Sequence, residues 1–177
     1  IYTVTLHANG GAIASGKDIT SYTYGAGATL PTENAITREG CTFDGWYADS
    51  SFSGAPVTAI SSTDTGDMTF YAKWEANTYT VTVQNDGNGT GTATPASATM
   101  GEEISLTATP NSGYRFKEWQ IVSGSVAISG DTFTMPADNV TVKAIFEKKS
   151  SVSSGGGGGG TTYYTLTLET NGGSSMK

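Results

Sequence analysis

"YTVTLHANGG" at residues 2–11 recurs with few changes as "YTVTVQNDGNG" at residues 79–89 and as "YTLTLETNGG" at residues 164–173. In the first copy, apolar residues such as Val4 and Leu6 alternate with polar ones, which is the period of a β-strand with one buried face. The Asn and Gly residues that follow tolerate the positive φ angles of a tight turn. This stretch therefore predicts a strand and its turn, repeated three times along the chain.

Two more blocks recur in the same order. "GCTFDGW" (residues 40–46) matches "GYRFKEW" (residues 113–119), since both have the pattern G-x-x-F-x-x-W. "MTFYAKWE" (residues 68–75) matches "VTVKAIFE" (residues 140–147), and both alternate as a core-facing strand does. Three blocks at a nearly constant offset indicate tandem repeats, with insertions confined to the loops.

The repeats predict the fold class and the domain organisation. We expect a mainly β or small α+β protein built of tandem small antiparallel-sheet modules. The one helix signal is "PTENAITRE" (residues 31–39), where Thr32 could cap a short helical piece. The predicted segments are a module at residues 1–76, a diverged module at residues 77–149, a flexible Ser/Gly linker at residues 150–162, and the first strand of a truncated third repeat at residues 163–177.

Aromatic residues are the expected anchors of each core. A module of about 75 residues buries only about 60% of its unfolded surface and has little stability to spare. Cys41 is the only cysteine, so intrachain disulfides and CxxC metal clusters are excluded, and we expect its thiol to be buried and inert. A Trp or Phe side chain buries about 150–250 Å². The predicted structural core consists of Phe43, Trp46, Trp74, Phe116, Trp119 and Phe146.

Composition and charge exclude several classes of partner. The formal net charge is −7, and no run of five or more basic residues occurs. We therefore expect no nucleic-acid partner and no binding to anionic membranes. No stretch of about 18 apolar residues occurs, so we expect no membrane insertion. The chain starts directly on a predicted strand without a signal peptide, which suggests a piece of a longer protein.

The sequence contains no set of residues that is typical of a catalytic or metal site. His7 is the only histidine and lies on the polar face of the first strand, without the Cys or second His that a zinc site needs. No G-x-S-x-G motif is present. "DTGD" (residues 64–67) and "NDGNG" (residues 85–89) resemble parts of calcium loops, but turn chemistry explains them equally well. We expect no catalytic residue, no cofactor and no metal site.

Three groups of residues are candidates for interaction. The aromatic residues outside the clearest core alternation could stack on sugars, or could pack at module edges: Tyr22, Tyr24, Tyr47 and Phe52. The strand of the third repeat could add to an exposed sheet edge through Tyr163, Tyr164, Leu166 and Leu168. Lys–Asn isopeptide crosslinks occur in Gram-positive stalks, and the lysines on terminal strands that could form one are Lys73 and Lys143.

These residues resemble a known family. "YGAGATLPTENAITREGCTFDGWYAD" and "MTFYAKW", together with the opening stretch, resemble the Listeria–Bacteroides repeat, also called the internalin B-type B repeat, over residues 1–76. Cys41 stands where that family usually has Tyr. "GYRFKEW", "SLTATPNSG" and "TFTMPADNVTVKAIF" resemble its divergent relative over residues 77–149. Residues 163–177 resemble the opening of another repeat of the first type.

The resemblance implies a fold, a location and a function. It implies a β-grasp-like (ubiquitin-like) first module in a secreted or cell wall-associated protein of a usually Gram-positive bacterium, in chains that often carry S-layer-homology anchors. It brings no catalytic residues. Our leading hypothesis is a non-enzymatic extracellular repeat segment that acts as a spacer or stalk and contacts neighbouring repeats. The alternative is an adhesin-type binding module for a host protein or glycan.

Overall fold

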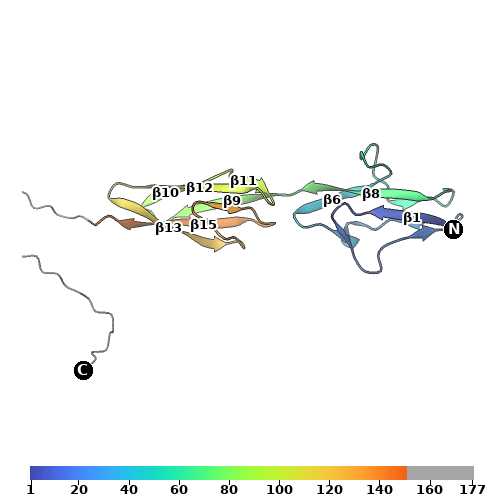
Figure 1. The fold of residues 1–177 in the computed structure, drawn as a ribbon, viewed down its shortest axis with the longest axis horizontal. Coiled ribbons are helices and arrows are strands. Elements are labelled where there is room, and N and C mark those ends of the chain that lie inside the picture. Colours follow the sequence, from blue (N-terminus) through green and yellow to red (C-terminus); the bar gives the residue numbers. More distant parts are fainter. Residues whose placement is uncertain (151–177) are drawn as a thin grey trace, which may run out of the picture.

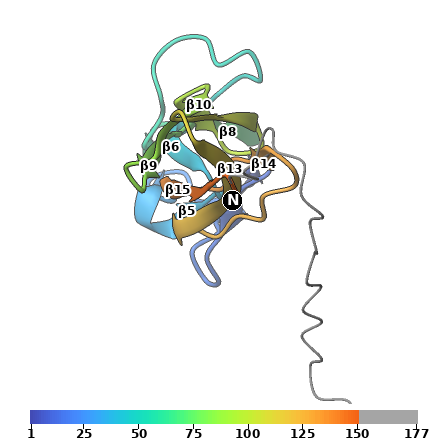
Figure 2. The same cartoon turned by 90° about the vertical axis from the view of Figure 1, so that its left-hand side faces the viewer.

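The computed structural model describes residues 1–150, which form two β modules placed end to end along one axis (Figure 1). Viewed along that axis, the two modules overlap in projection, and the loop of residues 48–56 stands out from the body (Figure 2). Within residues 1–150 the only helix is the three-residue 3₁₀ helix η1 (Glu33–Ala35). The predicted linker (residues 150–162), apart from Ser150, and the predicted first strand of a third repeat (residues 163–177) lie outside the described residues.

The first module has one four-stranded sheet and two short pairs. The sheet has the order β3-β1-β8-β6, while β2 pairs with β5 and β4 pairs with β7. The strands are β1 (Tyr2–His7), β2 (Ala12–Ile13), β3 (Ser21–Tyr22), β4 (Ala28–Thr29), β5 (Ile36–Thr37), β6 (Cys41–Tyr47), β7 (Ala59–Ile60) and β8 (Met68–Ala76).

The second module has the sheets β11-β9-β15-β13 and β10-β12-β14. Its strands are β9 (Thr78–Asn85), β10 (Gly89–Thr94), β11 (Ser97–Thr99), β12 (Glu103–Pro110), β13 (Tyr114–Ser123), β14 (Thr132–Thr134) and β15 (Val140–Lys148). The larger sheets of the two modules have equivalent orders, since β9, β15 and β13 carry the blocks that match β1, β8 and β6. The prediction of tandem small β modules is confirmed.

Each larger sheet is mixed, which corrects the expected antiparallel modules. β1 runs parallel to β8, and β9 runs parallel to β15. The flanking pairs β1–β3 and β6–β8, and their equivalents β9–β11 and β13–β15, are antiparallel. Parallel strands need a long crossover, and here the rest of each module supplies it.

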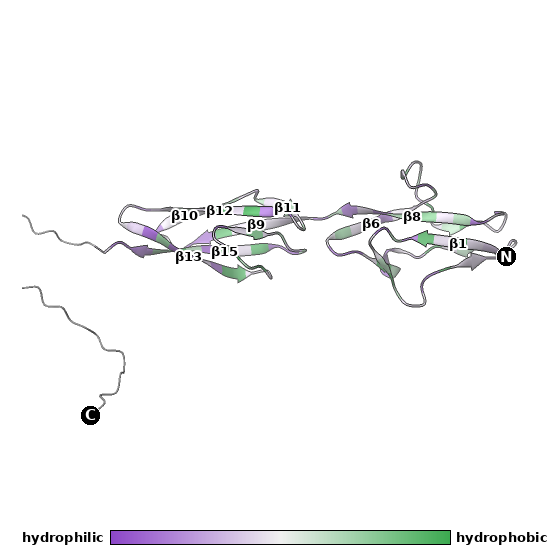
Figure 3. Ribbon diagram, viewed as in Figure 1, coloured by the Kyte–Doolittle hydropathy of each residue, from purple (hydrophilic) through white to green (hydrophobic). Residues whose placement is uncertain are grey.

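The alternation in the sequence produces the cores. Along β15, every second residue from Val140 to Phe146 is buried. Hydrophobic residues lie on the central strands of both modules (Figure 3). The buried core of the first module comprises Val4, Tyr22, Leu30, Ile36, Trp46, Ile60, Phe70 and Ala72. That of the second comprises Val81, Ala98, Ile104, Leu106, Phe133, Met135, Val140 and Val142.

The aromatic anchors differ between the modules. Trp46 is 1% exposed and lies in the first core. Phe43 packs against the ring of Trp46, and Trp74 packs against Phe43. Trp119 is only half-buried, with Phe116 against its ring. Phe146 is buried and contacts Phe116. The second core is instead mainly aliphatic, so Trp119 is a peripheral packing residue rather than the equivalent of Trp46.

The short helical piece predicted at residues 31–39 is largely absent. The 3₁₀ helix covers three residues, and β5 begins directly after it. Thr32 has extended backbone angles and makes no capping hydrogen bond. The side chain of Ile36 is 2% exposed, so burial in the first core fixes this segment as strand.

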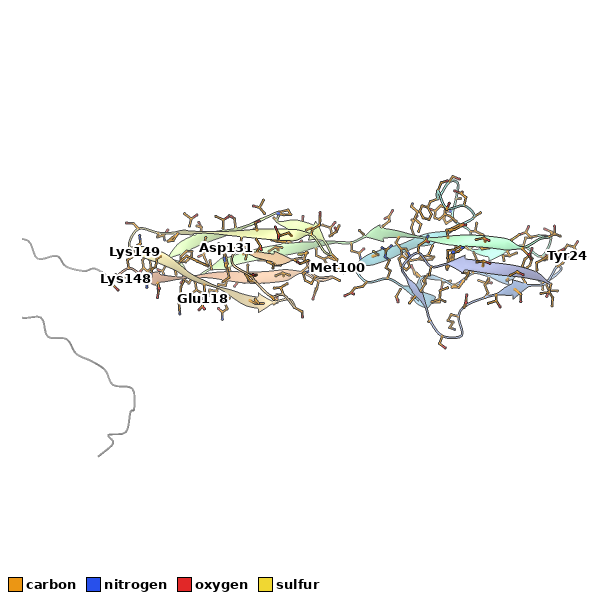
Figure 4. All side chains as sticks on the ribbon, in the orientation of Figure 1. Tyr24, Met100, Glu118, Asp131, Lys148 and Lys149 are labelled. Atoms are coloured by element: carbon orange, nitrogen blue, oxygen red, sulfur yellow. The ribbon has the colours of Figure 1, made fainter. Side chains whose placement is uncertain are left out.

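A single residue joins the modules. β8 ends at Ala76 and β9 begins at Thr78. The backbone N–H of Asn77 donates to Gly40 O (2.9 Å), and its side-chain Oδ1 accepts from Thr42 Oγ1 (2.6 Å). Across the joint, Met100 packs so closely on Gly40 that a Cβ there would lie 3.0 Å from Met100 Cβ. Figure 4 shows Met100 between the two modules.

Candidate functional site

A groove of about 450 Å³ lies in the first module beside β6. Its floor and walls are mainly apolar, and two acidic residues, Glu33 and Asp44, also line it. The apolar lining residues are Leu30, Pro31, Phe43, Trp46, Pro56 and Val57. Such a hollow is suited to an apolar or aromatic group that carries a polar or basic substituent.

Gly45 allows the loop of residues 48–56 to close over β6. β6 has a bulge between Phe43 and Gly45, and Gly45 adopts a φ of +148° that favours glycine. A Cβ on Gly45 would lie 2.6 Å from Pro56 Cβ, which is too close for any other residue without displacement. The wall that Pro56 forms therefore depends on this glycine.

Hydrogen bonds fix the indole beneath the groove. Trp46 Nε1 donates to Pro31 O at 2.8 Å, so the buried N–H has a partner. The backbone N–H of Val57 donates to Trp46 O at 2.7 Å and holds the loop against the strand. The groove is thus a built feature of three segments rather than a gap between mobile side chains.

Charged groups lie beside the groove. Asp44 Oδ2 accepts from Lys73 Nζ (2.7 Å) and from the Tyr47 hydroxyl (2.8 Å). The hydrogen bond from Lys73, and then that from Tyr47, holds the pKa of Asp44 below its usual value. The same carboxylate raises the pKa of Lys73 and of Tyr47. Both charged side chains are about one-third exposed, so the pair contributes modestly to stability.

The projecting loop is organised around Asp49. Its Oδ1 accepts from the backbone N–H of Ser51 at 2.8 Å, and its carboxylate also binds the hydroxyls of Ser51 and Ser53. These bonds lower the pKa of Asp49 to about 2. Phe52 has a φ of +57°, and its ring packs against that of Tyr47 with the two centroids 5.7 Å apart.

The four aromatic candidates for sugar stacking do not form one surface. Tyr22 is 3% exposed and belongs to the core, because its hydroxyl donates to Gly66 O and its ring packs on Tyr2. Tyr47 is also buried, so of the two alternatives given for these residues, packing within the module applies to both, and stacking on a sugar does not. Phe52 is half-buried against Tyr47. Tyr24 is 61% exposed at the end of the first module remote from the second (Figure 4).

The remaining sequence candidates occupy structural positions. His7 is exposed on β1 and stacks on Tyr71, with centroids 4.8 Å apart. Cys41 is a free thiol but only half-buried, not fully buried as expected. Lys73 binds the carboxylate of Asp44 and lies opposite Gly45 in the sheet, and Lys143 lies opposite Gln84 and Gln120.

The segments that resembled calcium loops have their carboxylates engaged with the backbone. Asp64 accepts from Ser61 N, Asp67 from Thr3 N, and Asp86 from Phe146 N. In the part of the chain that the structure describes, no group of three or more metal-ligating side chains occurs, and no helix has the length and apolarity to cross a membrane. The strand-exchange candidates Tyr163, Tyr164, Leu166 and Leu168 lie outside the described residues.

Sequence reasoning missed the groove, although one signal was present. Within the matched blocks, Gly45 corresponds to Glu118, which is exposed in the bulge of β13. A glycine at the point of a strand where its repeat has a large side chain indicates close approach of another segment. That segment, the loop carrying Pro56, could not be identified without the tertiary structure.

Comparison with known proteins agrees with this architecture. Residues 2–73 match the model of the Listeria–Bacteroides repeat domain, and residues 79–150 match that of the divergent InlB B-repeat domain. Residues 2–73 therefore belong to the Listeria–Bacteroides repeat family, and residues 79–150 belong to the divergent InlB B-repeat family. The resemblance seen in the sequence is therefore confirmed for both modules.

Two relatives place these repeats in larger proteins. Internalin H of Listeria monocytogenes is 31% identical over 134 residues, which cover 75% of this chain and 24% of the relative. A protein of Evansella cellulosilytica, named as a Gly-rich membrane protein, is 35% identical over 123 residues, which cover 67% of this chain and 13% of the relative. The chain thus spans a quarter or less of these relatives. They indicate a surface repeat region located outside the cell or in its envelope.

Proposed function

We propose that the two repeats act as a stiff, non-enzymatic spacer that holds other parts of a bacterial surface protein away from the cell. The observation that supports this role most directly is the joint, where one residue separates two central strands and is held by hydrogen bonds to Gly40 and Thr42. A flexible linker would instead let the modules tumble independently.

The end-to-end arrangement of the two modules makes the molecule elongated. β8 has 9 residues and β9 has 8, and they follow one another along the long axis (Figure 1). With a rise of about 3.3 Å per residue, the two strands and the joint extend over about 60 Å. Serial repeats of this kind add length in proportion to their number.

Spin labels on both sides of the joint test the spacer. Thr5 and Thr82 are exposed on β1 and β9, and each can be changed to Cys with Cys41→Ser. We expect the distance distribution between these labels to be as narrow as that of a pair within one module, Thr5 and the exposed Thr37 on β5. Insertion of Gly-Ser-Gly after Asn77 should broaden only the first distribution. A broad distribution in the native chain would contradict the spacer.

We propose binding of a surface protein or glycan as a second role for the first module, through the groove beside β6. Its support is the apolar lining together with the acidic side chain of Glu33, which favours a ligand with a basic group, since the carboxylate of Asp44 is already paired with Lys73. A ligand that uses the groove should shift the amide resonances of Phe43, Trp46 and Val57. A ligand that shifts only resonances elsewhere, for example around Tyr24, would move the binding role away from the groove.

A further inference from the structure

The first and last strands of each module are neighbours and run parallel. In the first module the register runs from Val4↔Met68 to His7↔Tyr71. In the second it runs from Val81↔Val140 to Asn85↔Ala144. Because the two strands are parallel, the chain enters each module at one end and leaves it at the other. Tension along the chain therefore pulls the two strands past each other along their own axes.

Side-chain bridges extend this pairing at both ends in the first module. Before the paired register, Thr3 N donates to Asp67 Oδ1 at 2.7 Å. After it, Asn9 Nδ2 donates to Ala72 O at 2.8 Å. Asp67 immediately precedes β8, and Asn9 follows β1. Both bridges join the segment of the first strand to that of the last.

The second module has the same two bridges with other side chains. Thr80 N donates to Asn139 Oδ1 at 2.8 Å, just before β15 begins. Phe146 N donates to Asp86 Oδ2 at 2.9 Å, just after β9 ends. Asp and Asn have exchanged places between the modules, yet each pair of terminal strands is bridged at both ends. Such bridges are additional to the backbone ladder and connect only the two strands that tension would separate.

We infer that each module is a force-bearing unit in which the parallel terminal strands and their Asp/Asn bridges form a shear clamp. This inference rests on the proposed role as a spacer and adds to it a load along the chain. In shear, the ladder bonds and both bridges carry the load together, so several must break in one step. Because forced unfolding is governed by the unfolding rate, the clamp slows the loss of the stalk under tension.

The joint transmits the load from one clamp to the next. β8 is the central last strand of the first module, and β9 is the central first strand of the second. Only Asn77 lies between them. Tension that leaves the first clamp through β8 therefore enters the second clamp directly through β9, without passing through a flexible segment.

Single-molecule pulling on the full chain, with handles at residues 1 and 177, tests the bridges. Asp67→Ala should speed forced unfolding of the first module roughly tenfold, as expected for loss of one charge-assisted hydrogen bond that the transition state would otherwise have to break. Asp64→Ala is the matched control, because Asp64 also accepts a backbone N–H at 2.8 Å, from Ser61, but within one turn. It should leave the forced unfolding rate unchanged.

The same comparison applies to the second module. Asn139→Ala removes a bridge, whereas Glu102→Ala removes a local bond to Thr99 N. If the bridge variants and their controls have equal effects on forced unfolding, the clamp is contradicted.

A change of pulling direction tests the clamp without altering it. Handles on Ile1→Cys and Ala76→Cys load β1 and β8 in shear, whereas handles on Ile1→Cys and Thr65→Cys pull apart the ends where both strands begin. With Cys41→Ser in both proteins, we expect the second geometry to unfold the first module at a much lower force, since the bonds then break one at a time. Equal forces would overturn the inference. This result is independent of the spin-label experiment, which tests whether the joint is stiff.

Discussion

The negative charge of the Asp86 carboxylate contributes to the stability of the second module. Its carboxylate accepts the backbone N–H groups of Phe146 and Asn88. The bond from Phe146, and then that from Asn88, lowers the pKa of Asp86 below its ordinary value. The equivalent position in the first module is Asn9, which bridges the same two strands without a titratable group.

We expect the second module to lose stability in acid as Asp86 becomes protonated. A carboxyl group with a depressed pKa in the folded state stabilises the fold above its unfolded pKa of about 3.9, and this contribution is lost as the pH falls through the folded value. The free energy of unfolding of the second module, measured with urea, should therefore fall more steeply between about pH 5 and pH 2 in the native protein than in Asp86→Asn. Parallel curves for the two proteins would show that Asp86 does not titrate with folding.

In strands β6 and β13, the residue at one position of the bulge determines whether another segment can pack against the strand. Both strands pair antiparallel with the last strand of their module, and both are bulged after the Phe of the F-x-x-W block. In β13 the bulge carries the exposed Glu118. In β6 the same position is Gly45, and Pro56 packs in the space that a side chain would occupy.

Gly45→Glu should displace the loop of residues 48–56 from β6 and remove one wall of the groove. We expect a loss of about 1–3 kcal/mol in the free energy of unfolding of the first module, from the clash with Pro56 and from the φ of +148°. Gly54→Glu is the control, because Gly54 also has a positive φ, +81°, but no atom lies within 4 Å of a Cβ there. Urea unfolding monitored by Trp fluorescence makes the comparison, and equal losses would mean that the contact with Pro56 is unimportant.

The molecule as a whole consists of two cores that share no buried residue. Each core is closed by strands of its own module. At the joint, Asn77 is hydrogen-bonded to Gly40 and Thr42, and Met100 of the second module packs against Gly40. The modules should therefore unfold as separate cooperative units while the joint keeps them aligned.

Trp46→Ala should unfold the first module and leave the second folded. Replacement of a buried Trp costs about 3–5 kcal/mol, a large part of a small domain's stability. Trp119→Ala should cost less, because Trp119 is half-buried and lies at the edge of the second core. Amide resonances of the two modules in ¹⁵N-labelled protein report each separately. Loss of both sets in either variant would contradict independent folding.

Local patterns in the sequence determined the elements and their repetition. Alternation identified β1, β8, β9 and β15, because the period of two follows directly from strand geometry. The G-x-x-F-x-x-W blocks located β6 and β13, and the family resemblance that they carried is confirmed. The burial of Trp46 could also be predicted, because the large apolar side chain of a Trp in a strand stabilises a small module most when it is buried.

Only the tertiary structure decided which strands meet. The parallel pairing of first and last strands, the burial of Tyr22 and Tyr47, and the groove between Gly45 and Pro56 all depend on segments far apart in the chain. Alternation shows which face of a strand is buried but not which strand lies beside it, since backbone hydrogen bonds are the same for every partner. The sequence alone therefore determined a string of β repeats, and the tertiary contacts decided that the first and last strands of each module pair in parallel.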